Sequence, residues 1–216
     1  KGTMESALRI CSIFVIPAGV GLSVLSYPIL NLLFFAQQDM VVTAAPLLAR
    51  LGFATTFVCL VSLSNSMLQA VGLVNVPVFT MLCGGVVKLV TNYTLIGIPT
   101  IGISGAPIGT SLCYGTITVL NLIFLVRKVK IMPNFFSIFG KPILASLAMA
   151  VVAVFSYRFG MPLLGEKMAT VVAIGVAGVV YLGVFTAMKG FVKEDIKLLP
   201  KGDALARLLE RRNLLG

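Results

Sequence analysis

The stretch from Met168 to Met188, MATVVAIGVAGVVYLGVFTAM, contains no charged residue. An α-helix needs about 20 apolar residues to cross the hydrocarbon core of a bilayer, so this stretch predicts a transmembrane helix. The whole chain has the same character: 58% of its 216 residues are hydrophobic, 11% are charged, and the mean hydropathy is +1.06. In a soluble domain roughly a quarter of the residues are charged. The composition therefore predicts a membrane protein.

Five further apolar stretches predict spans of the same kind. They cover residues 7–27, 44–71, 77–95, 105–126 and 136–157. We expect Pro28 to kink the end of the first span, and turns rich in glycine and proline at 72–76 and 97–105. The predicted fold class is all-α: a polytopic bundle of about six transmembrane helices.

The basic residues predict the orientation of these spans. Six crossings put both ends of the chain on one side, and that side holds 13 of the 17 Lys and Arg residues. The opposite side holds only Arg158 and Lys167. Because cytoplasmic loops carry the excess of Lys and Arg, we expect both ends to be cytoplasmic.

The net charge of +10 indicates the kind of partner. In a soluble protein it would favour nucleic acid, but in a membrane-embedded chain it favours anionic lipid headgroups and no nucleic acid. The basic tail from 191 to 216 predicts a short amphipathic helix on the inner leaflet, beginning near Asp203. A solvated, loosely ordered tail is the alternative.

The sequence also excludes several kinds of chemistry. It contains no histidine, which excludes imidazole catalysis and zinc sites with histidine ligands. No pair of carboxylates, nucleophile elbow or phosphate-cradling loop lies within or beside a span. We therefore expect no enzyme activity, no catalytic residue, no metal site and no cofactor.

Two charged side chains fall inside predicted spans, where charge is costly and often functional. Lys88 follows Pro77 by 11 residues, which places it roughly 16 Å along its helix and close to the bilayer centre. Asn92 is one turn away on the same face. A structural lysine bonded to carbonyls of a neighbouring helix is the alternative. Arg50 is nearer the end of its span, and we expect it to snorkel to the surface.

Polar residues form stripes on several spans. Asn65 and Gln69 share one face with Ser62 and Ser66, and a second stripe contains Thr110, Tyr114, Thr118 and Asn121. Either stripe alone is typical of contacts between helices. Together with Asn92 they predict a hydrated cavity that accepts a sugar or phosphate group, with Lys88 and, as an alternative to snorkelling, Arg50 as candidate counter-charges.

Proline and glycine mark positions where spans bend or approach each other. Pro17 lies inside the first span and is a candidate hinge. Six glycines predict close helix approach: Gly84, Gly85, Gly105, Gly109, Gly175 and Gly178.

Three stretches of the chain resemble a known family. The first contains LRI (8–10), IPAGVGL (16–22) and YPILNLLF (27–34). The second, and the most specific, contains MLQAVG (67–72), VP (76–77), GGVVKLVTNY (84–93), GIP (97–99) and GISGAPIGT (102–110). The third is EDIKLLPKG (194–202). Together they resemble the C-terminal part of polysaccharide-biosynthesis membrane proteins of the stage V sporulation protein B type, which belong, with the lipid II flippases, to the multidrug/oligosaccharidyl-lipid/polysaccharide exporter superfamily.

This resemblance implies a two-lobed transporter that works by alternating access. Residues 1–130 would be four helices of the second lobe, 131–190 an additional pair and 191–216 a cytoplasmic tail. The N-terminal lobe would be a partner absent from this chain. The cargo would be an undecaprenyl-linked oligosaccharide or peptidoglycan precursor, flipped across a bacterial cytoplasmic membrane. Lys88 and Asn92 match the family's Lys and Asn in the corresponding span.

Two other functions fit the same observations. One is a cation-coupled multidrug antiporter of the same superfamily, although the spans contain no Asp or Glu for the coupling ion. The other is a membrane scaffold for cell-envelope assembly that transports nothing.

Overall fold

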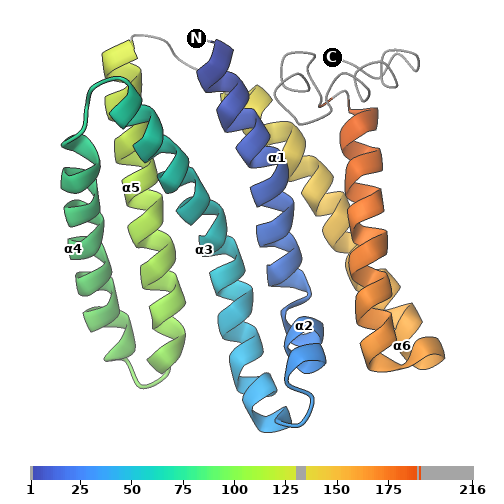
Figure 1. Ribbon diagram of the computed structural model, residues 1–216. Helices are drawn as coiled ribbons and strands as arrows, with labels where there is room; N and C mark the ends of the chain where they lie inside the picture. The colour runs from blue at the N-terminus through green and yellow to red at the C-terminus, as the bar shows by residue number, and fades with distance from the viewer. Residues whose placement is uncertain (1, 130–134, 189, 191–216) are drawn as a thin grey trace. The chain divides into compact units, whose positions relative to one another are not determined.

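The computed structural model of the protein describes residues 2–129, 135–188 and 190. These ranges are helical, contain no strand, and confirm the predicted all-α fold class (Figure 1). The elements in chain order are α1 (Gly2–Val24), α2 (Ser26–Leu33), α3 (Gln38–Ala70), α4 (Val76–Ile96), the 3₁₀ turn η1 (Gly102–Ser104), α5 (Gly105–Val129) and α6 (Phe135–Ala187).

Six helical segments of the described chain are long and apolar enough to cross a membrane. Four of them lie in α1, α3, α4 and α5, and the other two are the arms of α6, Ile138–Leu163 and Gly165–Ala187. The number of spans predicted from the sequence is confirmed. The chain is a multi-pass membrane protein.

The helices divide into two compact units. Helices α1 and α6 form one, which we call the α1/α6 unit, and α2 to α5 form the other, the α2–α5 unit. One border between the units lies close to the boundary at residue 130 implied by the family resemblance, but α1 belongs with α6 and not with α2 to α5. Which helices belong to which transporter lobe stays a prediction. The predicted tail helix lies outside the described residues.

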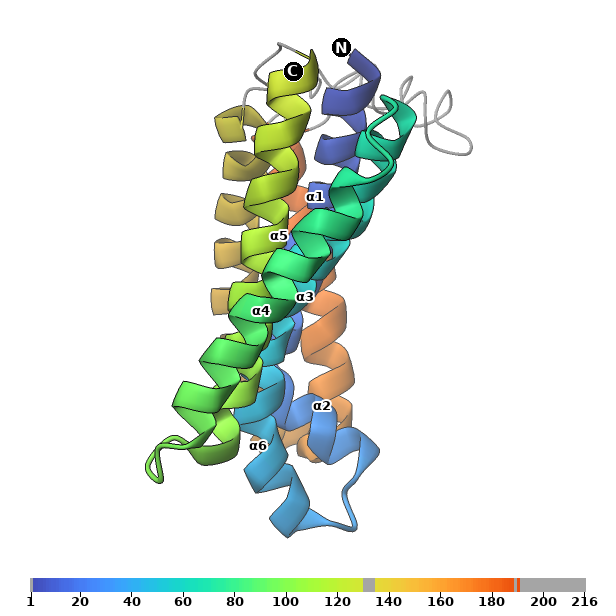
Figure 2. The same cartoon turned by 90° about the vertical axis from the view of Figure 1, so that its left-hand side faces the viewer.

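In the α2–α5 unit, α5 packs against both α3 and α4 (Figures 1 and 2). The contact between α4 and α5 is close at three glycines. A side chain at Gly84 would collide with Ile117, and one at Gly105 would meet Leu95. A side chain at Gly109 would collide with the Asn92 amide. These glycines allow the two backbones to approach, as predicted.

The α1/α6 unit packs mainly through alanine. Its second α6 arm buries a residue at every fourth position: Ala169, Ala173, Ala177, Tyr181 and Phe185. Residues four apart share one face of a helix, so this stripe is the side packed against the rest of the unit. Small alanine side chains thus provide the close packing in this arm.

The prediction of close approach was wrong for the other three glycines. A Cβ atom added at Gly85, Gly175 or Gly178 would meet nothing within 4 Å. In α6, Gly175 and Gly178 lie off the buried alanine stripe.

The first span breaks three residues earlier than predicted. The sequence places the kink at Pro28, whereas the helix is interrupted at Leu25, between α1 and α2. Proline has no N–H to donate to the carbonyl four residues before it, so Pro28 removes the helical hydrogen bond to the Val24 carbonyl. The break therefore appears upstream of the proline.

The connection between the last two spans is shorter than predicted. The predicted spans leave residues 158–167 between them, whereas the described spans are Ile138–Leu163 and Gly165–Ala187. Helical geometry continues through Arg158 and reverses at Gly165, which has φ 75° and ψ 162°. This backbone conformation is open to glycine and strained for other residues. One glycine thus makes the turn between the arms, and near it the Gly160 backbone approaches Ala169.

Candidate functional site

A buried polar network joins three helices of the α2–α5 unit. Asn121 on α5 is fully buried, and its Nδ2 donates to Ser64 Oγ at 2.9 Å and to Asn65 Oδ1 at 2.7 Å, both on α3. Thr80 on α4 donates its hydroxyl to Asn121 Oδ1 at 2.7 Å. Both amide hydrogens and the amide oxygen of Asn121 therefore have protein partners, as a buried amide within a membrane requires.

The network unites two of the predicted site residues and adds two that the sequence analysis missed. Asn65 and Asn121 were expected to face one cavity, and they are bonded to each other. Ser64 and Thr80 were not selected. A signal for Thr80 was present, since it lies one turn before the close-packed Gly84 on the same face of α4.

The rest of the predicted α3 stripe points elsewhere. Gln69 is exposed, and its side chain makes no hydrogen bond with any described residue. Ser62 and Ser66 are also exposed, and the Ser66 hydroxyl donates to the Ser62 carbonyl of its own helix at 3.0 Å. Part of the stripe thus lies outside the network.

Lys88 lies in the middle of α4. It follows Val76, the first residue of the helix, by 12 positions, which corresponds to about 18 Å of rise. Its side chain is half-buried, and it forms no hydrogen bond or ion pair with the part of the chain that the structure describes. The Cys113 thiol of α5 is close enough for an electrostatic interaction with it. The ammonium group thus has no counter-charge among these residues.

Asn92 lies one turn beyond Lys88 and packs against α5. Its amide occupies the space left by the absent side chain of Gly109. The Oδ1 atom is buried and accepts no hydrogen bond from the described residues. An unpaired buried amide oxygen is unfavourable. The Lys88 and Asn92 pair therefore has one unpaired cation and one unpaired acceptor on the same side of α4.

Tyr114 belongs to an apolar cluster. It packs against Val61, Cys113 and Ile117, where α3 and α5 meet. Its hydroxyl has no hydrogen bond within the described ranges. The structure thus places this predicted site residue against the packing core of the unit.

Arg50 follows Gln38, the first residue of α3, by 12 positions. Its side chain is exposed, and Nη1 donates to the Ser104 carbonyl of η1 at 3.3 Å. Because η1 lies in the connection between α4 and α5, this hydrogen bond places the Arg50 guanidinium at the end of that helical pair. This place suits a cation that reaches the headgroup region.

Pro17, the predicted hinge, lies inside a single helix. The structure describes α1 as continuous from Gly2 to Val24. The proline is half-buried in the α1/α6 unit.

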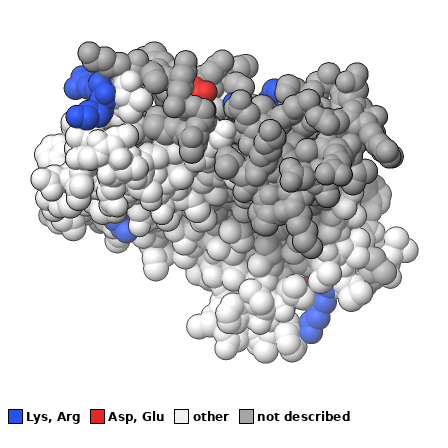
Figure 3. Space-filling view, turned by 45° about the horizontal axis from the view of Figure 1, so that its top comes forward, with Lys and Arg blue, Asp and Glu red and all other residues white. Residues whose placement is uncertain are grey.

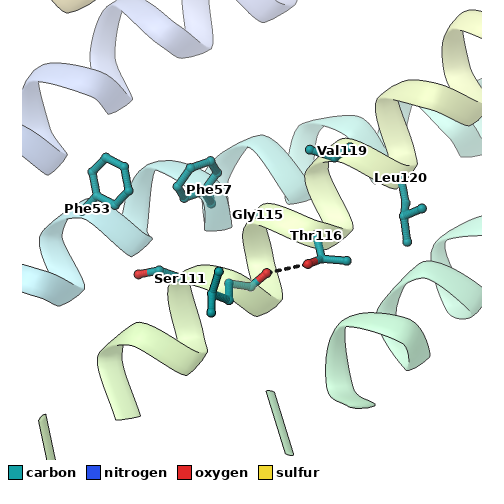
Figure 4. Close-up of a pocket in the computed structure, with 8 residues that line it drawn as sticks. Phe53, Phe57, Ser111, Gly115, Thr116, Val119 and Leu120 are labelled. Atoms are coloured by element: carbon teal, nitrogen blue, oxygen red, sulfur yellow. Dashed lines mark hydrogen bonds between the residues drawn. The ribbon is translucent and has the colours of Figure 1, made fainter. Parts of the chain in front are cut away.

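Two shallow grooves on the α2–α5 unit are apolar. The larger groove, of about 470 Å³, lies between α3 and α5 (Figure 4). Phe53 and Phe57 line it on the α3 side, and residues from Ser111 to Leu120 line it on the α5 side. The hydroxyls at its wall, on Ser111 and Thr116, donate to carbonyls of their own helix. The smaller groove runs along α4 beside Gly85. Neither groove is lined by any of the predicted site residues.

Charge on the visible surface is sparse. In the space-filling view the described atoms are mostly uncharged, with Lys and Arg in a few separate places (Figure 3). At the end of α5, Arg127 and Lys128 are exposed in the last turn. Within the described ranges no three His, Cys, Asp or Glu side chains come together as metal ligands.

Comparison of the chain with protein-family models, with curated proteins and with solved structures gives no match. The positions of Lys88, Asn92 and their neighbours are therefore the basis for assigning a function.

Proposed function

We propose that this chain is the C-terminal part of a flippase for lipid-linked oligosaccharide or peptidoglycan precursors. The observation that carries the proposal is the Lys88 ammonium, which lies midway along α4 and has no anion or carbonyl partner among the described residues. A charge at this depth costs about 2.5–3.5 kcal/mol even on the most permissive insertion scale. Such a cost is tolerated where the charge has a function.

The chemistry of the cargo explains that function. A lipid-linked sugar carries phosphate between its lipid and its sugar, and an ammonium group binds phosphate as a point charge. The alternative of a structural lysine bonded to a neighbouring helix receives no support, since Lys88 donates to no described carbonyl. Lys88 is therefore assigned to the phosphate of the cargo.

Asn92 supplies a second contact in this proposal. It shares the face of α4 with Lys88, and its side-chain amide makes no hydrogen bond with the described residues. The Asn92 amide nitrogen can donate to phosphate or sugar oxygens, whereas its oxygen is buried against Gly109 of α5. The pair would thus bind the polar head of the cargo, while an N-terminal lobe supplies the opposite wall.

In this proposal the orientation of the chain in its membrane follows from the distribution of charged residues. The chain would lie in a bacterial cytoplasmic membrane with both ends on the cytoplasmic side, where Arg127 and Lys128 would meet anionic lipid headgroups. Both side chains are exposed at the end of α5, as that role requires.

The test is Lys88→Ala in the full-length protein, reconstituted in vesicles with a lipid-linked oligosaccharide. A hydrogen bond to a charged group contributes about 1.5–3 kcal/mol, so we expect cargo binding to weaken about 10- to 150-fold and flipping to fall accordingly. Lys88→Arg should retain part of the activity. Lys128→Ala is the matched control, because it removes one exposed lysine from α5 and should leave flipping unchanged.

Unchanged flipping in Lys88→Ala would remove the cargo role of Lys88. A second assay separates flipping from drug export by the same architecture. Uptake of a fluorescent organic cation, driven by an ion gradient in the absence of lipid-linked sugar, would contradict the proposed cargo.

A further inference from the structure

Pro17 leaves one carbonyl of α1 without its usual donor. In an α-helix each carbonyl accepts from the N–H four residues ahead, and proline has no N–H. The carbonyl affected is that of Ile13. Ile13 is 4% exposed, so within a membrane no water replaces the missing bond.

A tyrosine of α6 occupies this position. The Tyr181 hydroxyl donates to the Ile13 carbonyl oxygen at 2.7 Å, across 168 residues of sequence. Tyr181 is 5% exposed, and its ring stacks on Phe185 with centroids 5.8 Å apart and planes 17° from parallel. The stacking fixes the ring, and Tyr181 continues the buried alanine stripe of the second α6 arm.

The hydrogen bond between Tyr181 and Ile13 satisfies two buried polar groups at once. A buried phenol needs an acceptor, and a carbonyl freed by proline needs a donor. A proline inside a helix does not always have such a donor: Pro46 frees the Val42 carbonyl of α3, and no side chain within the described ranges donates to it. One hydrogen bond thus connects the turn of α1 that ends at Pro17 to α6.

We propose that the Tyr181 hydroxyl is a latch that holds α1 in its unbroken path across Pro17. While the bond is made, the turn between Ile13 and Pro17 is held to α6. When it opens, that turn loses its only described connection of this kind and α1 bends at the proline. The inference concerns the α1/α6 unit alone and does not rest on the proposed cargo or on Lys88.

A double-mutant cycle tests the latch through the stability of the full-length protein in mixed micelles. Tyr181→Phe removes only the hydroxyl, and Pro17→Ala restores an N–H that can bond the Ile13 carbonyl itself. Hydrogen bonds between transmembrane helices contribute about 0.6–1.7 kcal/mol, so Tyr181→Phe should raise the unfolding equilibrium constant about 3- to 20-fold when Pro17 is present. In the Pro17→Ala background the same change should have an effect at least threefold smaller. Equal effects in the two backgrounds would overturn the proposal.

Amide hydrogen exchange distinguishes a latch at Pro17 from a bond that stabilises the whole protein evenly. We expect Tyr181→Phe to speed exchange of the Ala18 and Val20 amides, in the turn after Pro17, at least threefold more than exchange of the α3 amides. Tyr114→Phe is the matched control, because the Tyr114 hydroxyl has no hydrogen bond within the described ranges. Uniform acceleration across α1 and α3 would overturn the latch even if the Pro17→Ala protein could not be folded.

Discussion

The two units of this protein pack their helices by different means. In the α2–α5 unit, α4 and α5 approach through Gly84, Gly105 and Gly109, each of which faces a side chain of the neighbouring helix. In the α1/α6 unit the corresponding role belongs to buried alanines, with Ala169 and Ala173 fully buried. In lipid there is little hydrophobic drive between helices, so close contact of small residues must supply the attraction. Either glycine or alanine can serve when the facing side chain fits.

The units also differ in how they use hydrogen bonds. The α2–α5 unit places Asn121 at a point where three helices meet, and the α1/α6 unit makes one bond from Tyr181 to the Ile13 carbonyl. The first arrangement satisfies every polar atom of one side chain and fixes three helices together. The second supplies a donor to the Ile13 carbonyl, which Pro17 leaves without its helical partner. We therefore expect the α2–α5 unit to be the more sensitive to loss of a single polar group.

The largest effect is expected from Asn121→Leu. It removes three hydrogen bonds between helices, at about 0.6–1.7 kcal/mol each, so the free energy of unfolding should fall by about 2–5 kcal/mol. Reversible unfolding in mixed micelles measures this quantity. Thr116→Val is the matched control on α5, because the Thr116 hydroxyl bonds only to its own helix. A similar loss in both variants would show that the network adds nothing specific.

Gly105→Ala should have the next largest effect. The added Cβ would lie 2.8 Å from Leu95 Cβ and 3.2 Å from the Leu95 carbonyl carbon, so the backbone itself must move. Overpacking of this kind costs about 1–3 kcal/mol. Gly115→Ala, on the same helix with nothing within 4 Å, should instead be neutral or stabilising. If the two variants unfold alike, close approach at Gly105 is not what stabilises the α4–α5 pair.

The spans themselves were predictable because charge and hydropathy alone decide which segments enter a membrane. Details that depend on backbone geometry were not. The break near Pro28 shifts to Leu25 because proline acts on the turn before it. Arg158 was expected at the membrane surface, just after the 136–157 span, and the helix continues beyond it, because a long cationic side chain can reach the surface from within a helix.

The site was predictable in its residue types and less so in its pairing. Asn65 and Asn121 were selected because polar residues recurred on one face of each helix, and these two are bonded together. Their partner Ser64 was missed, because which edge of a stripe faces a neighbour depends on the rotation of the helix. That rotation is set by packing, here by glycines on α4 and α5, and cannot be obtained from one helix alone.

The smallest effect is expected from Gly175→Ala in α6. This variant tests whether glycine packing is confined to the α2–α5 unit. The sequence suggests that Gly175 is a packing glycine, yet an added Cβ would meet nothing within 4 Å. Alanine should therefore raise the free energy of unfolding by up to about 1 kcal/mol, through higher helix propensity alone. Ala173→Gly, two positions away and fully buried, should lower it by about 1 kcal/mol or more, because it loses propensity and packing together. Reversible unfolding of the two variants side by side decides the matter: if Gly175→Ala destabilises as Gly105→Ala does, glycine makes the close contacts in both units, and the distinction between them is wrong.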